Sequence, residues 1–128
     1  MASENPSVVE KTIKELNKHA ELMDLMGLDK SHYYPINIHI NTTKPTREEA
    51  AQRFVDNFSL LSDSCKSRLT LENDDSPNQY SVKILHDFVY TKTNIPIVFD
   101  QHHFNYGLQD QTMEEALRLA HSLSLIHI

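Results

Sequence analysis

The sequence contains only two glycines, one cysteine and no long hydrophobic run among its 128 residues. Because there is no glycine-rich phosphate loop, a dinucleotide-binding fold is disfavoured. The single cysteine, Cys65, excludes an internal disulfide framework and agrees with a reducing compartment, and we interpret it as a bystander. No apolar segment approaches the roughly 18 residues that cross a bilayer, and residues 1–6 lack the features of a signal peptide. We therefore expect a soluble, intracellular protein that does not associate with membranes.

Positive charge is also scarce, since 12 Lys and Arg stand against 18 Asp and Glu and give a formal net charge of −6. This balance argues against a generic basic nucleic-acid patch, because nonspecific backbone binding needs clustered Lys and Arg. It is compatible with a metal-dependent enzyme, because bound divalent cations reverse the local sign of an acidic pocket. The chain also carries eight histidines, which is many for its size. Its length suits a single domain.

Helices and strands are expected to alternate along the chain. Apolar residues at helical spacing predict helices over 6–26, 46–61, from residue 81 and from residue 112. Apolar and β-favouring runs predict strands at 35–40, 69–72 and 95–100, the last of them buried on both faces. Capping residues are expected at the helix starts, and Gly27 is a plausible stop for the first helix. The predicted N-caps are Ser7, Thr46, Ser81 and Thr112. Such alternation predicts a parallel sheet with crossover helices.

Acidic and histidine side chains stand at or near the carboxyl ends of these three strands. His39 closes the first strand, Glu72 the second and Asp100 the third, and a loop histidine, His102 or His103, follows. The ends of neighbouring parallel strands open onto one mouth, where α/β folds place their ligands. Imidazoles and carboxylates form a ligand set suited to Mn²⁺, Zn²⁺ or Fe²⁺. The pattern therefore predicts a metal site at this edge.

Each of these signals has an alternative interpretation. A single histidine such as His39 in a strand is often structural, and Asp100 after a strand is often a helix N-cap or a turn former. Asn73, Asp74 and Asp75 are consistent with a polar loop, in which Asn73 could support a ligand or the substrate. Because acidic or histidine residues stand at three successive strand ends, we nevertheless favour the metal site.

Several segments of the chain resemble one family, the UV damage endonucleases. The most specific are LENDD at residues 71–75 and the strand with its DxHH ending at residues 95–103. Tyr80-Ser81-Val82 and the segments 7–10, 26–29, 37–39 and 114–118 fit the same register, so the resemblance covers residues 5–121. The family commonly carries a glycine pair after the strand histidine, where this chain has Asn41 and Thr42.

The resemblance implies a TIM (β/α)₈ barrel, of which this chain would supply about three parallel strands and four helices. It implies a DNA repair endonuclease, a metal-dependent phosphodiester hydrolase that nicks damaged double-stranded DNA 5′ to UV photoproducts. The implied cofactors are divalent metal ions, with Mn²⁺ favoured over Zn²⁺ or Mg²⁺. A monomer located in the cytoplasm, nucleoid or nucleus is expected.

Carried over by motif, the resemblance also assigns roles to individual residues. The implied metal ligands are His39, Glu72, Asp100 and His103. The implied catalytic residues are Glu72, Asn73 and His102, with Glu72 placed to bridge two ions. These assignments are expectations that follow from the resemblance.

Two regions are expected within the chain, and two other functions remain open. Residues 1–122 would form a partial TIM-barrel endonuclease domain, and residues 123–128 a non-native read-through tail. Such a central fragment is expected to be inactive alone. One alternative is a sugar isomerase or another metal-dependent enzyme of the same barrel superfamily. The other is a noncatalytic α/β binding module whose acidic residues only form loops.

Overall fold

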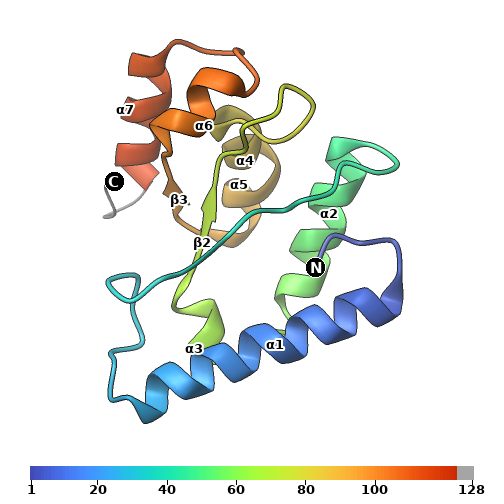
Figure 1. Ribbon diagram of the computed structural model, residues 1–128, viewed down its shortest axis with the longest axis vertical. Coiled ribbons are helices and arrows are strands. Elements are labelled where there is room, and N and C mark those ends of the chain that lie inside the picture. The colour runs from blue at the N-terminus through green and yellow to red at the C-terminus, as the bar shows by residue number, and fades with distance from the viewer. Residues whose placement is uncertain (124–128) are drawn as a thin grey trace.

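Three parallel strands form the central sheet of the computed structural model, which describes residues 1–123 (Figure 1). The strands β1 (Ile36–Ile38), β2 (Leu69–Glu72) and β3 (Ile97–Val98) are hydrogen-bonded in the order β1-β2-β3. Both outer strands run parallel to β2, as the alternation of elements predicts. The strands are shorter than expected, although the Pro96 carbonyl still accepts a hydrogen bond from the Leu71 amide, 3.0 Å away.

The structure contains more helices than the four predicted. In the described residues they are α1 (Pro6–Leu25), α2 (Arg47–Phe58), α3 (Asp63–Lys66), α4 (Val82–Leu85), η1 (His86–Tyr90), α5 (Thr91–Thr93), α6 (Gln101–Tyr106) and α7 (Met113–Leu123). The elements α4, η1 and α5 follow one another directly, with η1 as a π-helical turn. Figure 1 shows α1 along the bottom of the view, and α6 and α7 near the upper end of β2. No helix in this part of the chain combines the length and apolar character of a membrane span.

Side chains cap the helices largely as predicted. The Thr46, Ser81 and Thr112 hydroxyls each accept a hydrogen bond from the amide three residues on, at 3.2 Å. The prediction for α1 is wrong, because Asn5 caps this helix by accepting from the Ser7 amide at 3.0 Å. Pro6 stands between them at the first helical position, where its missing N–H costs nothing.

The segment after β3 also differs from expectation. The sequence predicts a loop for His102 and His103, but the structure places both in α6, which begins after Asp100. Only Phe104 of this helix is buried, so the segment has no apolar periodicity that sequence analysis could detect. At the other end of the chain, Leu123 is the last residue of α7. Residues 124–128, and with them most of the predicted tail, lie outside the described residues.

The register of the sheet divides its side chains between two faces. Asn37 pairs with Thr70, and Glu72 pairs with Val98. Because side chains alternate along a strand, these four share one face, and Leu69, Leu71 and Ile97 occupy the other. Those three are at most 1% exposed and form the centre of the core under the helices. Burial on both faces of β3 was expected, but Val98 is only partly buried.

Candidate metal centre

The sheet register brings His39 next to Glu72. Ile38 is paired with Leu71, so the next residue along each chain lies at the same level, just where β1 and β2 end. His103 comes from the first turn of α6, which follows β3 after a short connection. Three segments far apart in sequence therefore converge at the carboxyl end of the sheet, as the strand order predicts.

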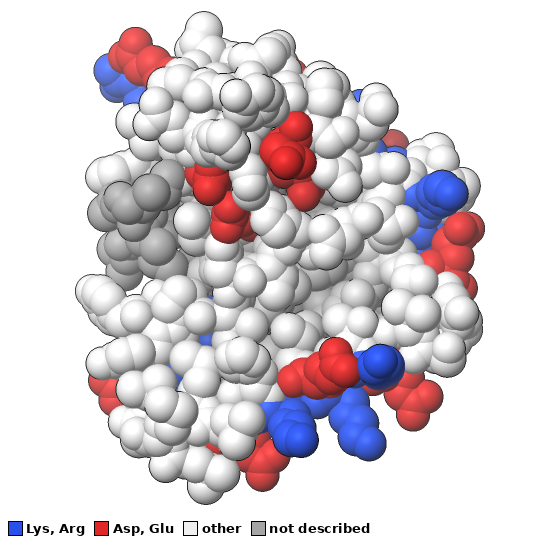
Figure 2. Space-filling view, in the orientation of Figure 1, with Lys and Arg blue, Asp and Glu red and all other residues white. Residues whose placement is uncertain are grey.

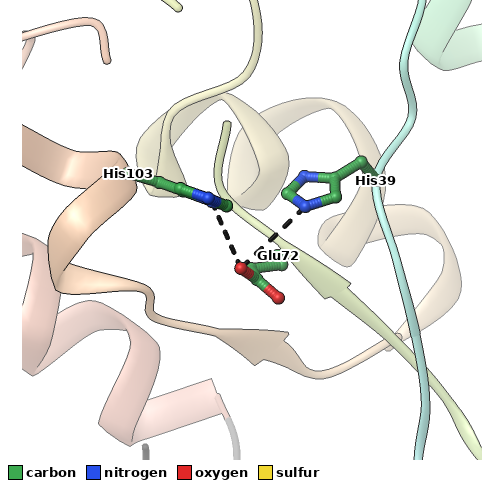
Figure 3. Close-up of side chains that lie close together, drawn as sticks. All are labelled: His39, Glu72 and His103. Atoms are coloured by element: carbon green, nitrogen blue, oxygen red, sulfur yellow. Dashed lines mark ion pairs between the residues drawn. The ribbon is translucent and has the colours of Figure 1, made fainter. Parts of the chain in front are cut away.

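Two imidazoles, those of His39 and His103, approach the same oxygen of the Glu72 carboxylate (Figure 3). His103 Nδ1 lies 3.2 Å from Glu72 Oε1, and His39 Nε2 lies 3.9 Å from the same oxygen. The two imidazole rings are 5.3 Å apart and tilted by 47°. One donor atom from each of the three residues lies within 4.8 Å of the other two.

The second oxygen of Glu72 is held by the inner face of the sheet. Asn37 Nδ2 donates to Glu72 Oε2, and the buried Thr70 hydroxyl donates to Asn37 Oδ1 at 2.8 Å. This chain of bonds fixes the carboxylate so that Oε1 faces the two histidines. Sequence analysis missed Asn37, although its strand alternation with Ile36 and Ile38 places it on the same face as His39.

Asn73 connects the end of β2 to the end of β3. Its side chain is 2% exposed, donates to the Asp100 carbonyl at 3.0 Å and accepts from the Asp100 amide at 2.8 Å. Its own carbonyl oxygen lies 2.9 Å from His103 Nδ1. The structure therefore places this predicted catalytic residue behind the site, where it holds backbone and supports His103.

Asp100 caps α6, which is the alternative that sequence analysis left open. Its Oδ1 accepts from the His103 amide at 2.8 Å, and the residue is not among the three whose donor atoms converge in the described structure. Burial opposes its ionisation, but the hydrogen bond from His103 and the nearby His103 imidazole lower the pKa of Asp100. An ionised carboxylate is thus retained beside the cluster.

His102 lies on the exposed side of α6. Its ring is 5.1 Å from the ring of Tyr106, one turn further along the helix, and 6.2 Å from the ring of His103. His102 is absent from the three-residue cluster. Of the residues that the sequence singles out, the described structure therefore brings together His39, Glu72 and His103.

The region around the cluster is acidic. Figure 2 shows a group of acidic side chains over the upper end of β2 with no lysine or arginine directly beside it on this face, whereas lysines and arginines lower on the face stand beside other acidic side chains. Burial alone would favour neutral His103, but the Asn73 carbonyl and the carboxylates of Asp100, Glu72 and Asp75 raise its pKa. A divalent cation is the partner that would balance such a field.

Behind His39 stands Asp74, a residue that sequence analysis assigned only to a polar loop. Asp74 is 6% exposed, and its Oδ1 lies 2.9 Å from His39 Nδ1. Burial raises the pKa of Asp74, while the charge of His39 and a hydrogen bond from the Tyr80 amide act against this effect. The only signal in the sequence was its place two residues after the strand end.

The donor set fits a divalent transition metal. Two imidazole nitrogens and a carboxylate oxygen suit Mn²⁺, Zn²⁺ or Fe²⁺. Each ligand candidate also has a supporting partner, as metal ligands commonly do. Glu72 is held by Asn37, and His39 contacts Asp74 through Nδ1. The Asn73 carbonyl accepts from His103 Nδ1, so the lone pair of a neutral His103 is on Nε2.

Parallel strands that deliver imidazoles and a carboxylate to one end of a sheet define a metal-binding α/β protein of the TIM-barrel type. The sequence model of UV-endonuclease UvdE matches residues 1–124, and the chain belongs to this family. The resemblance noted in the sequence is thereby confirmed.

Relatives and a solved structure agree with this assignment. A UV DNA damage endonuclease of Bacillus cereus (strain G9842) is 35% identical over 115 residues, which cover 90% of this chain and 35% of that protein. One of Bacillus anthracis (strain A0248) is 32% identical over the same shares. The crystal structure of SacUVDE matches with a TM-score of 0.85 and 32% identity, over 97% of this chain and 40% of that one. The chain thus spans little more than a third of the length of these curated relatives, and the predicted fold class is confirmed.

Proposed function

We propose that this chain is the central segment of a metal-dependent DNA repair endonuclease. The complete enzyme would nick the phosphodiester bond 5′ to UV photoproducts in double-stranded DNA. The observation that carries the proposal is the convergence of His39, Glu72 and His103 at the strand ends of a chain that belongs to the UV-endonuclease family. The complete enzyme would act as a soluble, intracellular monomer.

Four residues would hold the divalent metal, for which Mn²⁺ is our first choice and Zn²⁺ or Mg²⁺ the alternatives. They are His39, Glu72, His103 and the neighbouring Asp100. A metal in such a site supplies Lewis-acid polarisation of a phosphoryl oxygen and a water of lowered pKa. In this chain Asn37 orients Glu72 toward the two imidazoles, and Asn73 holds the backbone of Asp100.

Two further residues have proposed roles nearer to the DNA. The exposed ring of His102 stands beside His103 on α6, where it can reach a phosphate or leaving group that enters the site. Glu72 offers Oε1 to the cluster, and release of Oε2 by Asn37 would let it bridge two ions. Because the chain spans 35% of its curated relatives, we propose that it is inactive without the rest of the barrel.

The experiment uses the protein encoded by the gene with its flanking sequence, alongside the 128-residue chain. With Mn²⁺, the longer protein should nick UV-irradiated supercoiled plasmid and leave unirradiated plasmid intact. His39→Ala and Glu72→Gln should lower nicking to background, whereas the control His19→Ala changes an exposed histidine of α1 and should be neutral.

Other outcomes would favour the alternatives. Metal-dependent turnover of sugars without nicking would point to an isomerase of the same superfamily. Indifference to metal in both binding and activity would point to a noncatalytic module, and either result contradicts the proposal.

A further inference from the structure

Asp74 is a buried carboxylate with partners on both of its oxygens. Its side chain is 5% exposed, and burying a carboxylate is costly unless its oxygens find hydrogen-bond donors. Oδ2 accepts from the Tyr80 amide at 3.2 Å, and Oδ1 lies 2.9 Å from His39 Nδ1. The side chain that the Asp74 carboxylate contacts through Oδ1 is therefore His39.

The backbone around Asp74 is fixed from several directions. The Asp74 amide donates to the Tyr80 carbonyl at 2.9 Å, which closes the loop between these two residues at its base. Tyr80 is 1% exposed, and its hydroxyl lies 2.8 Å from the Thr42 carbonyl and 2.9 Å from the Arg47 carbonyl. Gly107 packs so closely on the Asp74 carbonyl that a Cβ at that position would approach it to 2.5 Å. Asp74 is therefore a rigid support.

The two nitrogens of His39 face different groups. Nδ1 faces Asp74, while Nε2 faces Glu72 Oε1 at 3.9 Å and belongs to the ligand cluster. A neutral imidazole carries its proton on one nitrogen and a lone pair on the other. An ionised carboxylate only accepts, so Asp74 favours the proton on Nδ1 and leaves the lone pair on Nε2.

We propose that Asp74 is a positioning residue, which selects the Nδ1–H tautomer of His39 and holds its ring so that Nε2 presents a lone pair to a divalent metal. The close contact is not aligned as a hydrogen bond, since His39 Nδ1 is buried with no aligned partner. This inference rests on the proposed function only in requiring that a metal binds at the cluster.

Asp74→Asn tests the proposal almost without change in shape. The side-chain oxygen of the new Asn can still accept from the Tyr80 amide. In that orientation the Asn NH₂ group points toward His39 Nδ1. That donor favours the tautomer with the proton on Nε2, where metal binding is blocked. Asp75→Asn is the matched control, because it removes the same charge from the adjacent, exposed residue.

Two readouts in the 128-residue chain are independent of DNA cleavage. The ¹⁵N shifts of the His39 ring, assigned through the signals lost in His39→Gln, report its tautomer in the metal-free protein. Titration with Mn²⁺ alone gives the affinity, which should fall about 10–100-fold in Asp74→Asn and by a much smaller factor in Asp75→Asn, whose exposed carboxylate contributes only to the acidic field around His103. The tautomer should be Nδ1–H in wild type and in Asp75→Asn, and Nε2–H in Asp74→Asn.

The outcomes separate this proposal from the proposed function. Wild-type affinity and tautomer in Asp74→Asn would overturn the positioning role while leaving the endonuclease proposal intact. Failure of the longer protein to nick irradiated DNA would overturn the endonuclease proposal while leaving the positioning role of Asp74 intact. If Asp74→Asn does not fold, the wild-type tautomer alone still decides, since finding the proton on Nε2 contradicts the proposal.

Discussion

The Cys65 thiol shows how burial decides the chemistry of a single residue. It is buried in α3, and this burial raises its pKa to about 11. Because the thiolate is the reactive form, the native protein should react very slowly with a thiol reagent such as DTNB near neutral pH. Unfolding in guanidinium should release one equivalent of reactive thiol. The absorbance of the anion that DTNB releases measures the rate in the native protein and the number of thiols that react after unfolding. Rapid labelling of the native chain would contradict the buried placement of Cys65.

The residues around the candidate metal centre differ in how far the sequence foretells their place. Glu72 and His39 are predictable because apolar runs mark the strands that they end. Asp74 is not, because its role depends on His39, a partner on another strand, and a local pattern does not encode such a contact. Asn37 is intermediate, since strand alternation predicts its face but not its hydrogen bond to Glu72.

Gly107 lies where the end of α6 is in close contact with the loop that contains Asp74. It ends α6 against the loop after β2, where an added Cβ would lie 2.5 Å from the Asp74 carbonyl and 3.0 Å from the His103 carbonyl. Since both contacts are backbone, Gly107→Ala should destabilise the protein by about 1–3 kcal/mol, measured by urea unfolding. It should also shift the His39 ring signals, because Asp74 would be displaced.

Gly27→Ala provides the comparison. Gly27 has φ +75° after α1, with nothing within 4 Å of an added Cβ. Here Ala should cost about 1 kcal/mol through backbone strain and leave the His39 signals unchanged. Equal effects of the two substitutions on His39 would show that the contact at Gly107 does not support the site.

The end of α1 is joined to the start of β2 by a buried arginine. Arg68 is fully buried and donates to Asp24 Oδ1 at 2.8 Å and to the Leu28 carbonyl at 2.6 Å. Hydrogen bonds from Arg68 and Ser64 lower the pKa of Asp24. A carboxylate with a lowered pKa adds stability that is present above its unfolded pKa of about 3.8 and is lost as the pH falls through the folded value.

Asp24→Asn should therefore be less stable than wild type at pH 7, and the difference should shrink as the pH falls below about 5. Urea unfolding midpoints between pH 7 and pH 3 measure this dependence. Glu21→Gln, an exposed change one turn earlier in α1, is the control and should leave the pH profile unaltered. A variant whose profile runs parallel to wild type would exclude a linkage between Asp24 and Arg68.

Elements of the fold were predictable in proportion to their length and periodicity. The long helices α1 and α2 follow from apolar spacing and capping residues. The six-residue α6 does not, because one buried phenylalanine makes no pattern and tertiary contacts decide its conformation. The π-helical turn η1 gives no signal in the sequence either, since its residues continue the pattern of α4.

For the whole molecule, alternating elements and the handedness of crossovers predict the β1-β2-β3 parallel order. Topology then explains why side chains from residues 39, 72 and 103 meet. The exact ligand set lies beyond this reasoning, because the direction of each side chain depends on contacts such as those of Asp100 with α6.

A metal held by these residues would couple three separate segments, since His39 follows β1, Glu72 ends β2 and His103 lies in α6. Binding to the folded state alone adds about 2.7 kcal/mol when the free metal reaches a hundredfold excess over its Kd. For a domain of this size that corresponds to a rise in Tm of roughly 10 °C. Differential scanning fluorimetry with Mn²⁺ should show this rise in wild type and in the exposed control Glu114→Gln, and should lose it in Glu72→Gln. An equal rise in all three proteins would mean that the metal binds elsewhere, because Glu72 is the carboxylate that contacts both imidazoles in the described part of the chain.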